Sequence, residues 1–378
     1  MKTQTIGILG GGQLARMTSY AAFQFGFRVA IFERQPESPA GQLTSLNVVG
    51  EWHDATKQAE FARLCHLVTL ENEFIEAEHL RQLESFGTPV LPSPDTIARI
   101  QDKLTQKETL ENAGLPVAPF RSIGSKAEAE KFGEEFGYPF LLKARQGGYD
   151  GYGNRTVRTA SEIEKALSDL GFPNRRVMAE AFVAFQAELA TMVARSQRGE
   201  VVVYPVVETV QENHICKIVK APAPFEHKVL TDASELAREA ILAIKGIGIF
   251  GVEMFLTSSG KVLINELAPR PHNSGHYTIE ACITSQFENH LRAVLGYPLG
   301  SPDMMVKAAV MVNLLGTRNA PVELSTLPSA LCHARAKVHI YGKKDSRIGR
   351  KMGHITVVGE SLENCLQEAQ AAAAAISL

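Results

Sequence analysis

The pattern of apolar and polar positions changes near residue 100. Before it, short apolar runs at residues 5–9, 27–32 and 67–70 alternate with stretches of helical periodicity. Continuous apolar strands that alternate with helices are typical of a doubly wound parallel sheet. After residue 100 the strand runs carry apolar–polar alternation, as at residues 188–193. This alternation is typical of antiparallel strands with one buried face, so the chain is predicted to combine an α/β part with an α+β part.

Prolines and composition shifts mark the borders of the predicted domains. Three prolines fall within residues 89–94. We predict a Rossmann-like parallel-sheet domain over residues 1–98, a central α+β domain over residues 99–296 and a small β-rich domain over residues 297–378. The alanine-rich end of the chain, residues 362–378, is predicted to form a terminal helix.

Composition narrows the classes of function. Hydrophobic residues make up 45% and charged residues 21% of the 378 positions, the profile of a globular protein. A formal charge of -2 lacks the basic excess that binds a nucleic-acid backbone, so no nucleic-acid partner is expected. No apolar run approaches a membrane span and no signal peptide is visible, so we expect a cytoplasmic protein without membrane contact. The cysteines lack the spacing of a metal site or a disulfide framework: Cys65, Cys216, Cys282, Cys332 and Cys365.

The densest group of functional side chains lies in residues 265–275, Asn-Glu-Leu-Ala-Pro-Arg-Pro-His-Asn-Ser-Gly. An apolar strand pattern precedes it, and an earlier strand pattern carries Glu253. Because the turn at residues 257–260 joins the two strands, Glu253 and Glu266 are predicted to be neighbours. Two carboxylates and the amide oxygen of Asn265 are hard ligands that suit Mg²⁺ shared with substrate phosphates. The sequence therefore predicts a magnesium site here.

Arg270 and His272 follow the predicted metal site. A guanidinium and an imidazole at this place can clamp an anion beside the metal. The alternative is a polar turn after an edge strand, but turns rarely need Glu, Arg, His and Asn together between two prolines. The pattern therefore favours a functional site.

A glycine-rich turn near the N-terminus suggests a different function. Gly10, Gly12 and Ala15 follow the first predicted strand and fit G-x-G-x-x-A, and Glu33 ends the second strand. Strand, glycine turn, helix, strand and acidic residue together form the dinucleotide-binding fingerprint. An NAD- or flavin-dependent oxidoreductase is therefore one alternative. The helix N-terminus also favours a simple phosphate, and glycines let a helix start close to a strand in any doubly wound domain.

A second glycine-rich segment, residues 146–154, follows a strand that ends in Lys143. Such a loop can lay backbone N–H groups over phosphates while the lysine supplies charge, and the alternative is a plain hairpin loop. The segment lacks the Walker sequence. Lys103, in a helix predicted over residues 100–112, either reaches a phosphate or is an ordinary surface lysine. Glu180, near the end of another strand, can receive a ribose hydroxyl.

In this order the motifs resemble the ATP-grasp superfamily and, within it, the N5-carboxyaminoimidazole ribonucleotide synthetase family of purine biosynthesis. The resemblance covers nearly the whole chain. It implies an ATP-dependent carbon–nitrogen ligase with a Rossmann-like pre-ATP-grasp domain, a central two-lobed ATP-grasp domain and a small C-terminal β-rich domain. The stretches that carry it are residues 10–14, 101–104, 147–151, 265–276, 285–287, 313–316 and 349–354.

The resemblance also implies a reaction. ATP would phosphorylate bicarbonate to carboxyphosphate. The amine of 5-aminoimidazole ribonucleotide (AIR) would then capture the carboxyl group, giving a carbamate, ADP and phosphate on the de novo route to IMP. A glycine loop would close the site, because carboxyphosphate decomposes in water. The partners would be ATP, Mg²⁺, bicarbonate, AIR and a second copy of the chain in a homodimer.

The implied site residues fall into four groups. ATP would be held by Lys103, Lys143, Gly148, Tyr149, Asp150, Gly151, Tyr152, Gly153, Asn154, Glu180, Ala181, Phe182, Val183, Glu188, Gln211, Asn265 and Glu266. Mg²⁺ would be held by Glu253, Asn265 and Glu266. AIR would be held by Gln13, Glu73, Tyr149, Asp150, Lys343, Arg350 and Lys351. Bicarbonate and the developing charge would be held by Arg270, His272, Asn273 and Asp150, and either His272 or Asp150 would take the amine proton.

Some positions depart from the family pattern. Tyr152 stands where the loop usually carries a cation, Asn154 replaces a glutamine, and Gln211 replaces a histidine. These differences predict weaker nucleotide binding with the metal ligands intact. A further alternative is an ATP-grasp ligase that activates formate or a peptide carboxylate. It shares the magnesium glutamates but does not account for residues 271–275 or 349–354.

Overall fold

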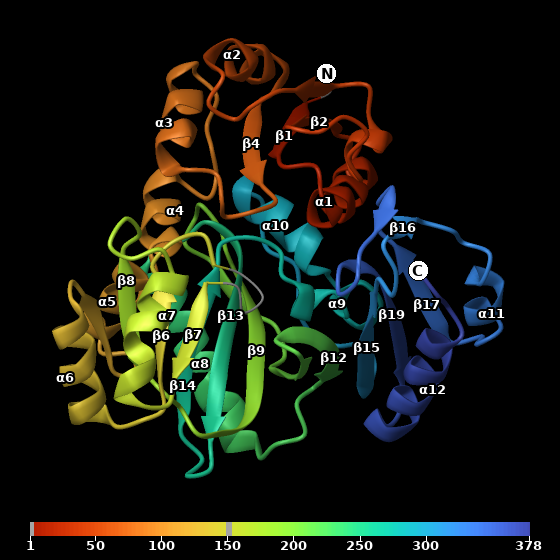
Figure 1. Ribbon diagram of the computed structural model, residues 1–378. Helices are drawn as coiled ribbons and strands as arrows, with labels where there is room; N and C mark the ends of the chain where they lie inside the picture. The colour runs from red at the N-terminus through yellow and green to blue at the C-terminus, as the bar shows by residue number, and fades with distance from the viewer. Residues whose placement is uncertain (1–3, 149–152) are drawn as a thin grey trace.

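In the computed structural model, which describes residues 4–148 and 153–378, the chain folds into three parts (Figure 1). The N-terminal part, at the top of the view, is built on a parallel sheet in the order β3-β2-β1-β4. Every residue of β1 is buried, as its apolar run predicted. The elements are β1 (Thr5–Leu9), α1 (Gln13–Gln24), β2 (Arg28–Glu33), η1 (Gly41–Leu43), β3 (Asn47–Val49), α2 (Ala55–Leu64), β4 (Leu67–Leu70) and α3 (Ala77–Ser85).

The small lobe of the central part is an antiparallel sheet in the order β5-β8-β6-β7. Phe132 of α6 and Ile163 of α7 pack with Phe140, Leu142 and Val157 of the sheet, so the two helices share its core. The elements are β5 (Phe120–Ile123), α6 (Lys126–Phe136), β6 (Phe140–Ala144), β7 (Asn154–Val157), η2 (Ala160–Glu162), α7 (Ile163–Asp169) and β8 (Val177–Ala181).

One long antiparallel sheet runs through the other central lobe and the C-terminal part. Its order is β14-β13-β9-β11-β12-β15-β19-β17, with β10 paired to β9. The C-terminal strands therefore extend the central sheet, joined to it where β12 pairs with β15. The strands are β9 (Phe185–Arg195), β10 (Val201–Val203), β11 (Val207–Glu212), β12 (Ile215–Ala221), β13 (Gly248–Thr257), β14 (Val262–Ala268), β15 (Ala308–Leu315), β17 (Ala336–Ile340) and β19 (Lys351–Gly359), and β16 (Ala320–Pro321) pairs separately with β18 (Asp345–Ser346).

Helices cover this sheet at both ends. Helix α8 (His227–Ala243) packs on β9, β10, β13 and β14, and α12 packs on β15 and β19. The terminal helix ends at Ala374, short of the predicted residue 378. Within the described residues, none of the helices has the length and apolar character needed to cross a bilayer. The remaining helices are η3 (Asn273–Gly275), α9 (Thr278–Ala281), α10 (Gln286–Val294), α11 (Leu327–Leu331) and α12 (Leu362–Ala374).

The predicted helix over residues 100–112 is two helices. Helix α4 (Pro94–Gln101) ends one residue before Asp102, and α5 (Lys103–Asn112) begins one residue after it. The Asp102 carboxylate accepts the N–H groups of Leu104 and Thr105 and so caps α5. The prediction missed this break because the apolar periodicity runs through it. The cap places Lys103 at the first position of α5.

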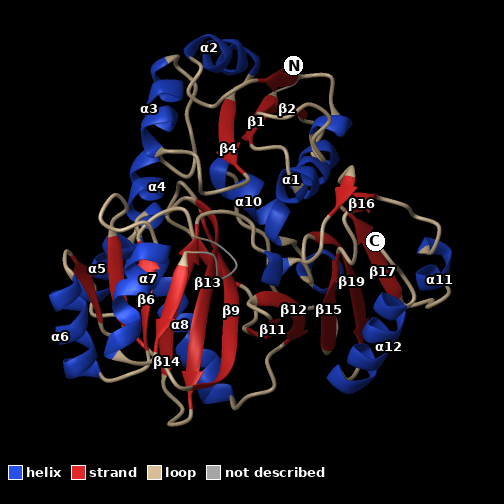
Figure 2. Cartoon of the chain, viewed as in Figure 1, coloured by secondary structure: helices blue, strands red, loops and turns tan. Residues whose placement is uncertain are grey.

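Helix α10 joins the N-terminal part to the long sheet (Figure 2). His290 lies 2.7 Å from the Thr69 hydroxyl of β4 and accepts the Ile249 N–H of β13 at 3.2 Å. Burial lowers the pKa of His290 to about 3, so its imidazole is neutral. Strand β13, which carries Glu253, therefore packs against a helix that is fixed to both β4 and β13 by hydrogen bonds.

Candidate active site

The two glutamates predicted to hold a metal are direct neighbours. Glu253 of β13 and Glu266 of β14 are paired in register. The next pair is Met254 with Ile264, so Asn265 is the extra residue of a β-bulge. Bulges often re-aim side chains beside active sites. The predicted turn at residues 257–260 sets this register, and the arrangement follows the prediction from sequence.

The electrostatics of this pair favour a cation. Burial, Glu266 and Glu188 raise the pKa of Glu253 to about 7. Glu266 also forms an ion pair with Lys103 at 2.5 Å. The side chains of Glu253 and Glu266 are 34% and 43% exposed, so an ion can reach both. Hard oxygen ligands of this kind fit Mg²⁺.

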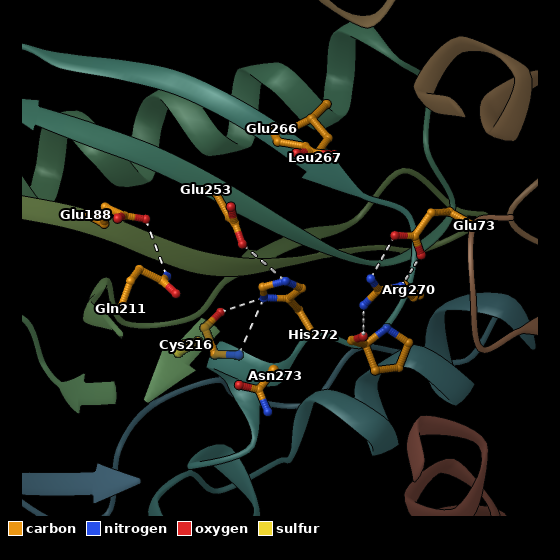
Figure 3. A network of polar contacts seen from close by, with 12 residues as sticks. Glu73, Glu188, Gln211, Cys216, Glu253, Glu266, Leu267, Arg270, His272 and Asn273 are labelled. Atoms are coloured by element: carbon orange, nitrogen blue, oxygen red, sulfur yellow. Dashed lines mark hydrogen bonds and ion pairs between the residues drawn. The ribbon is translucent and has the colours of Figure 1, made fainter. Parts of the chain in front are cut away.

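His272 points its imidazole at Glu253 (Figure 3). Its Nδ1 lies 2.8 Å from the Ser274 hydroxyl and accepts the Ser274 N–H. We therefore assign the proton to Nε2, which lies 3.3 Å from Glu253 Oε1. Burial and the positive charges of Arg270 and Lys351 lower the pKa of His272 well below its usual value. His272 is thus a neutral hydrogen-bond donor beside the metal site.

Arg270 is paired with Glu73 from the loop after β4 (Figure 3). Its Nη2 donates to Glu73 Oε1 at 2.8 Å and its Nε donates to Oε2. Burial would raise the pKa of Glu73, but the charge of Arg270 outweighs it and lowers that pKa. The sequence assigned Glu73 to AIR and Arg270 to bicarbonate, and the structure brings these two sites into contact.

On the nucleotide side, Glu180 is held by two lysines. Lys143 Nζ lies 2.8 Å and Lys107 Nζ 3.0 Å from its carboxylate oxygens. Burial would raise the pKa of Glu180, but the two lysines lower it to about 2. Glu180 is 1% exposed, so both lysines hold its side chain in this structure, and its predicted contact with a ribose hydroxyl stays a prediction. The sequence analysis missed Lys107, although its i,i+4 spacing from Lys103 on one helix was a signal.

Glu188 and Gln211, which are also predicted to bind ATP, lie on β9 and β11. Gln211 Nε2 donates to Glu188 Oε2 at 3.4 Å, and burial raises the pKa of Glu188. Gly153 has φ +85°, a conformation that favours glycine, and Asn154 begins β7. Gly148 also lies within the described part of the loop. The predictions for Tyr149, Asp150, Gly151 and Tyr152 lie outside the described residues, and Ala181, Phe182 and Val183 lie at the end of β8.

The N-terminal glycine turn is filled by carboxylates. Gly11 N–H donates to Glu33 at 2.8 Å, and Ala15 N–H donates to Glu71 at 3.3 Å. A Cβ at Gly12 would lie 2.4 Å from Glu71 Oε1, so the glycine makes room for this side chain. The Glu71 side chain thus lies at the start of α1, where the dinucleotide alternative needs a pyrophosphate. The geometry of the glycine turn therefore gives the oxidoreductase interpretation no support. Gln13, predicted to bind AIR, is the first residue of α1.

The basic residues predicted to bind AIR lie in the loop between β17 and β19. Lys343 Nζ donates to the Lys351 carbonyl at 2.6 Å, and Arg350 donates to the Asp345 carbonyl at 2.8 Å. The loop contacts the N-terminal part, because Gln42 donates to the Gly342 carbonyl at 2.9 Å. The structure therefore places this basic loop against the η1 segment of the N-terminal part.

Asn273 has a different environment from the predicted one. Its side chain exchanges hydrogen bonds with the Asn313 amide of β15, at 2.9 and 2.6 Å. Asn313 also donates to the Cys216 carbonyl at 2.9 Å. Asn273 is 8% exposed and paired, so its side chain anchors the segment in this structure, and its predicted contact with bicarbonate stays a prediction. Sequence gave no signal for this pair.

Paired carboxylates on neighbouring strands of one sheet, with Lys103 of α5 on one of them and a buried lysine–glutamate cluster on a second sheet, fit an ATP-grasp enzyme. A family model described as "ATP-grasp domain" matches residues 108–287. The models "Ribonucleotide synthetase preATP-grasp domain" and "Phosphoribosylaminoimidazole carboxylase C-terminal domain" match residues 1–101 and 309–368. The chain belongs to the N5-carboxyaminoimidazole ribonucleotide synthase family.

Named relatives carry this assignment. The chain is 38% identical to the N5-carboxyaminoimidazole ribonucleotide synthase of Synechococcus elongatus over 97% of its own length and 93% of that protein. It is 43% identical to the phosphoribosylaminoimidazole carboxylase of Ogataea methanolica, over 97% of its own length and 68% of the relative. For the carboxylase of Schizosaccharomyces pombe the share is 66%. The chain thus spans about two thirds of these longer relatives.

Solved structures agree over the whole fold. The N5-carboxyaminoimidazole synthase of Aspergillus clavatus in complex with ADP and AIR matches with a TM-score of 0.91 at 37% identity, covering 99% of this chain and 98% of that one. The synthetase of Thermotoga maritima matches with a TM-score of 0.88 at 40% identity, covering 99% of both chains. The predicted fold class and family are confirmed.

Proposed function

We propose that this chain carboxylates AIR with ATP and bicarbonate, through carboxyphosphate, to give N5-carboxyaminoimidazole ribonucleotide, ADP and phosphate. The observation that carries the proposal is the pair Glu253–Glu266, flanked by Lys103 on one side and His272 on the other. A metal at this pair would separate a phosphate-binding side from an anion-binding side. That geometry suits transfer of a phosphoryl group to a small oxyanion.

Glu253 and Glu266 would hold Mg²⁺, with the bulge residue Asn265 beside them. When bound, the ion supplies charge neutralisation for the phosphates. Burial and the neighbouring charge of Glu266 raise the pKa of Glu253 to about 7, and a divalent cation would offset the cost of ionising both carboxylates there. In this structure Lys103 forms an ion pair with Glu266. With the ion bound to Glu266, the Lys103 ammonium group would bind a phosphate oxygen instead.

The anion side would be formed by Arg270 and His272. His272 would donate its Nε2 proton in a hydrogen bond to a bicarbonate oxygen, because its depressed pKa keeps it neutral. The planar guanidinium group of Arg270 can donate two parallel hydrogen bonds to a carboxylate-like ligand. In this structure the Glu73 carboxylate accepts them. The lowered pKa of His272 makes its imidazole a weak acceptor for the amine proton. Asp150, the other candidate for that role, remains part of the proposal.

We also propose a homodimer in the cytoplasm. Ile283 and Met305 lie on adjacent backbone segments, linked where Met305 N–H donates to the Ala281 carbonyl at 2.8 Å. Their side chains are 58% and 63% exposed. Exposed apolar side chains on neighbouring segments favour contact with a second chain. Light scattering at several protein concentrations tests this state.

The experiment for the reaction is an ADP-release assay in which each substrate is omitted in turn. Release should need ATP, Mg²⁺, bicarbonate and AIR together. The alternative ligase predicts release with formate or a peptide carboxylate in place of bicarbonate. Formate-driven release that is independent of AIR would overturn the proposal.

A binding experiment separates the nucleotide classes. Mg²⁺–ATP should raise the thermal midpoint of the protein because it binds the folded state. NAD should leave the midpoint unchanged, because Glu33 and Glu71 fill the glycine turn. A rise with NAD alone would contradict this account.

A further inference from the structure

Gln286 is a fully buried polar residue that contacts the catalytic segment. It is the first residue of α10, directly after the helix cap Ser285, and it is 0% exposed. Its Oε1 accepts the His272 N–H at 2.9 Å, and its Nε2 donates to the His272 carbonyl at 2.8 Å. One carboxamide thus pairs both backbone groups of His272, as a neighbouring β-strand would. A buried amide with this many partners is placed in a single orientation.

The same carboxamide fixes a second histidine. Gln286 Nε2 lies 3.1 Å from His276 Nδ1. Because the hydrogen bond from His272 N–H identifies the other Gln286 atom as oxygen, this nitrogen must donate, and the His276 proton is on Nε2. Burial lowers the pKa of His276 well below its usual value, so the ring is neutral. Gly275 leaves room for the clamp, since a Cβ there would lie 2.6 Å from Gln286 Oε1.

The helix that presents Gln286 is anchored along its length. Asn289 donates to the Tyr204 hydroxyl at 2.8 Å and to the Gly300 carbonyl at 3.0 Å. One turn away from Gln286, His290 contacts Thr69 and Ile249. Gln286 N–H is itself taken up by the Thr278 hydroxyl at 3.0 Å. Through the two hydrogen bonds of Gln286, the well-anchored helix α10 therefore fixes the position of the His272 backbone.

We propose that Gln286 is a positioning residue for the reaction, because it holds the His272 peptide so that the imidazole aims at Glu253 and at the anion beside it. The proposal rests on the proposed function, in which His272 donates to bicarbonate. His272 lies outside regular secondary structure, directly before η3, so its orientation depends on such contacts. A displacement of about 1 Å at a reacting group can cost about 100-fold in rate.

The test uses Gln286→Met, which keeps the shape and removes both hydrogen-bonding atoms, and Gln286→Glu, which keeps an acceptor and removes the donor. Both should lower kcat for ADP release by about 10- to 100-fold. The Kd for Mg²⁺–ATP should stay within about twofold, because Gln286 contacts no predicted ATP residue. Gln58→Met removes an equally buried glutamine, 2% exposed, in the N-terminal part and should leave kcat unchanged.

A double-mutant cycle with His272→Ala separates positioning from a general loss of structure. If Gln286 acts through His272, Gln286→Met costs nothing further in the His272→Ala background. Amide hydrogen exchange gives a readout without activity, and Gln286→Met should speed exchange in the peptide that contains His272. Equal kcat losses in both backgrounds, or unchanged exchange, would overturn the positioning role. Failure of wild-type ADP release would instead refute the proposed function, and the exchange result would still decide whether Gln286 holds the segment.

Discussion

The cations at the site each face a carboxylate. Lys103 contacts Glu266, Lys143 contacts Glu180, and Arg270 contacts Glu73. An anionic substrate therefore has to displace a carboxylate from the cation that it binds. A metal ion bound at Glu266 would release Lys103 in this way. Phosphoryl transfer depends on such positioning and charge neutralisation more than on a protein nucleophile. Activity at this site should therefore depend on the two glutamates that would hold the metal, Glu253 and Glu266.

Replacement of Glu266 by Gln tests this point. The change removes the negative charge but keeps an acceptor for Lys103, so the fold should remain intact. We expect turnover to fall by about 100-fold or more, since a direct ligand matters at least as much as an outer-shell partner. Steady-state ADP release measures it, with the exposed Glu212→Gln as the control. Wild-type turnover in Glu266→Gln would remove this residue from the metal site.

Glu253 predicts a pH dependence. Because its pKa is raised to about 7, the folded protein takes up a proton there more readily than the unfolded chain, and this contribution to stability is lost as pH rises from 4.5 through 7. Metal binding needs the carboxylate, so Mg²⁺–ATP affinity should fall by about tenfold per pH unit well below pH 7. Calorimetric titration between pH 5 and 8 measures this slope. Glu253→Gln should flatten it, and an equal slope in the variant would assign the titration elsewhere.

At the scale of elements, α5 delivers Lys103 through its cap. Asp102 accepts two N–H groups of α5 and also pairs with Arg145, whose Nη2 lies 2.8 Å from Asp102 Oδ2. The Lys103 N–H donates to the Arg145 carbonyl at 2.8 Å, so helix, arginine and lysine are linked. The cap is thus part of the nucleotide side of the site.

Asp102→Ala should therefore affect both stability and nucleotide binding. Loss of a cap costs about 1 kcal/mol, and the uncompensated, largely buried Arg145 adds to it, for a total of about 3 kcal/mol. Asp102→Asn keeps the cap and should cost less. Urea unfolding and the Kd for ATP measure the two effects. Ser125→Ala removes the exposed cap of α6 and should lower stability by about 1 kcal/mol without changing ATP affinity, and equal ATP affinities in all variants would contradict the link.

The sequence predicted the strands more reliably than the side-chain contacts between segments that are distant along the chain. The Glu253–Glu266 pair was found because a short turn fixes its register. Lys107, Gln286 and Asn313 were missed as site-forming residues. Their roles depend on contacts between distant segments, such as the pair of Asn273 with Asn313, and no local pattern encodes those contacts. The glycine turn misled for the opposite reason, since its local pattern is the same whether a phosphate or Glu71 fills it.

At the scale of the whole molecule, the C-terminal strands support the catalytic segment. Three cross-strand neighbours, Asn313, His354 and His339, face residues of the segment from η3 to α9. Asn313 bonds to Asn273, and His339 Nε2 lies 2.6 Å from Glu280 Oε1. The rings of His276 and His354 are 4.9 Å apart. A polar row thus joins the end of the long sheet to the loop that carries His272.

Asn313→Leu tests whether the C-terminal sheet supports the segment that carries His272. Asn313 lies 40 residues from its partner Asn273 in the sequence. It removes the hydrogen bonds that the Asn313 amide makes with the Asn273 side chain and with the Cys216 carbonyl, which should cost about 1–3 kcal/mol and lower kcat. Thermal unfolding and ADP release measure the two effects. Met311→Leu, on the same face of β15, should cost less than about 1.5 kcal/mol and keep kcat. Wild-type kcat in Asn313→Leu would show that the segment does not need the C-terminal sheet.

The central claim is that ATP and bicarbonate react with each other at the Glu253–Glu266 pair. Oxygen-18 bicarbonate tests it directly, because phosphorylation joins a bicarbonate oxygen to phosphorus and later cleavage of the C–O bond leaves that oxygen on phosphate. In the complete reaction with ATP, Mg²⁺ and AIR, mass spectrometry of the released phosphate should show one oxygen-18 atom per turnover. Phosphate without the label, released as AIR is carboxylated, would contradict the account.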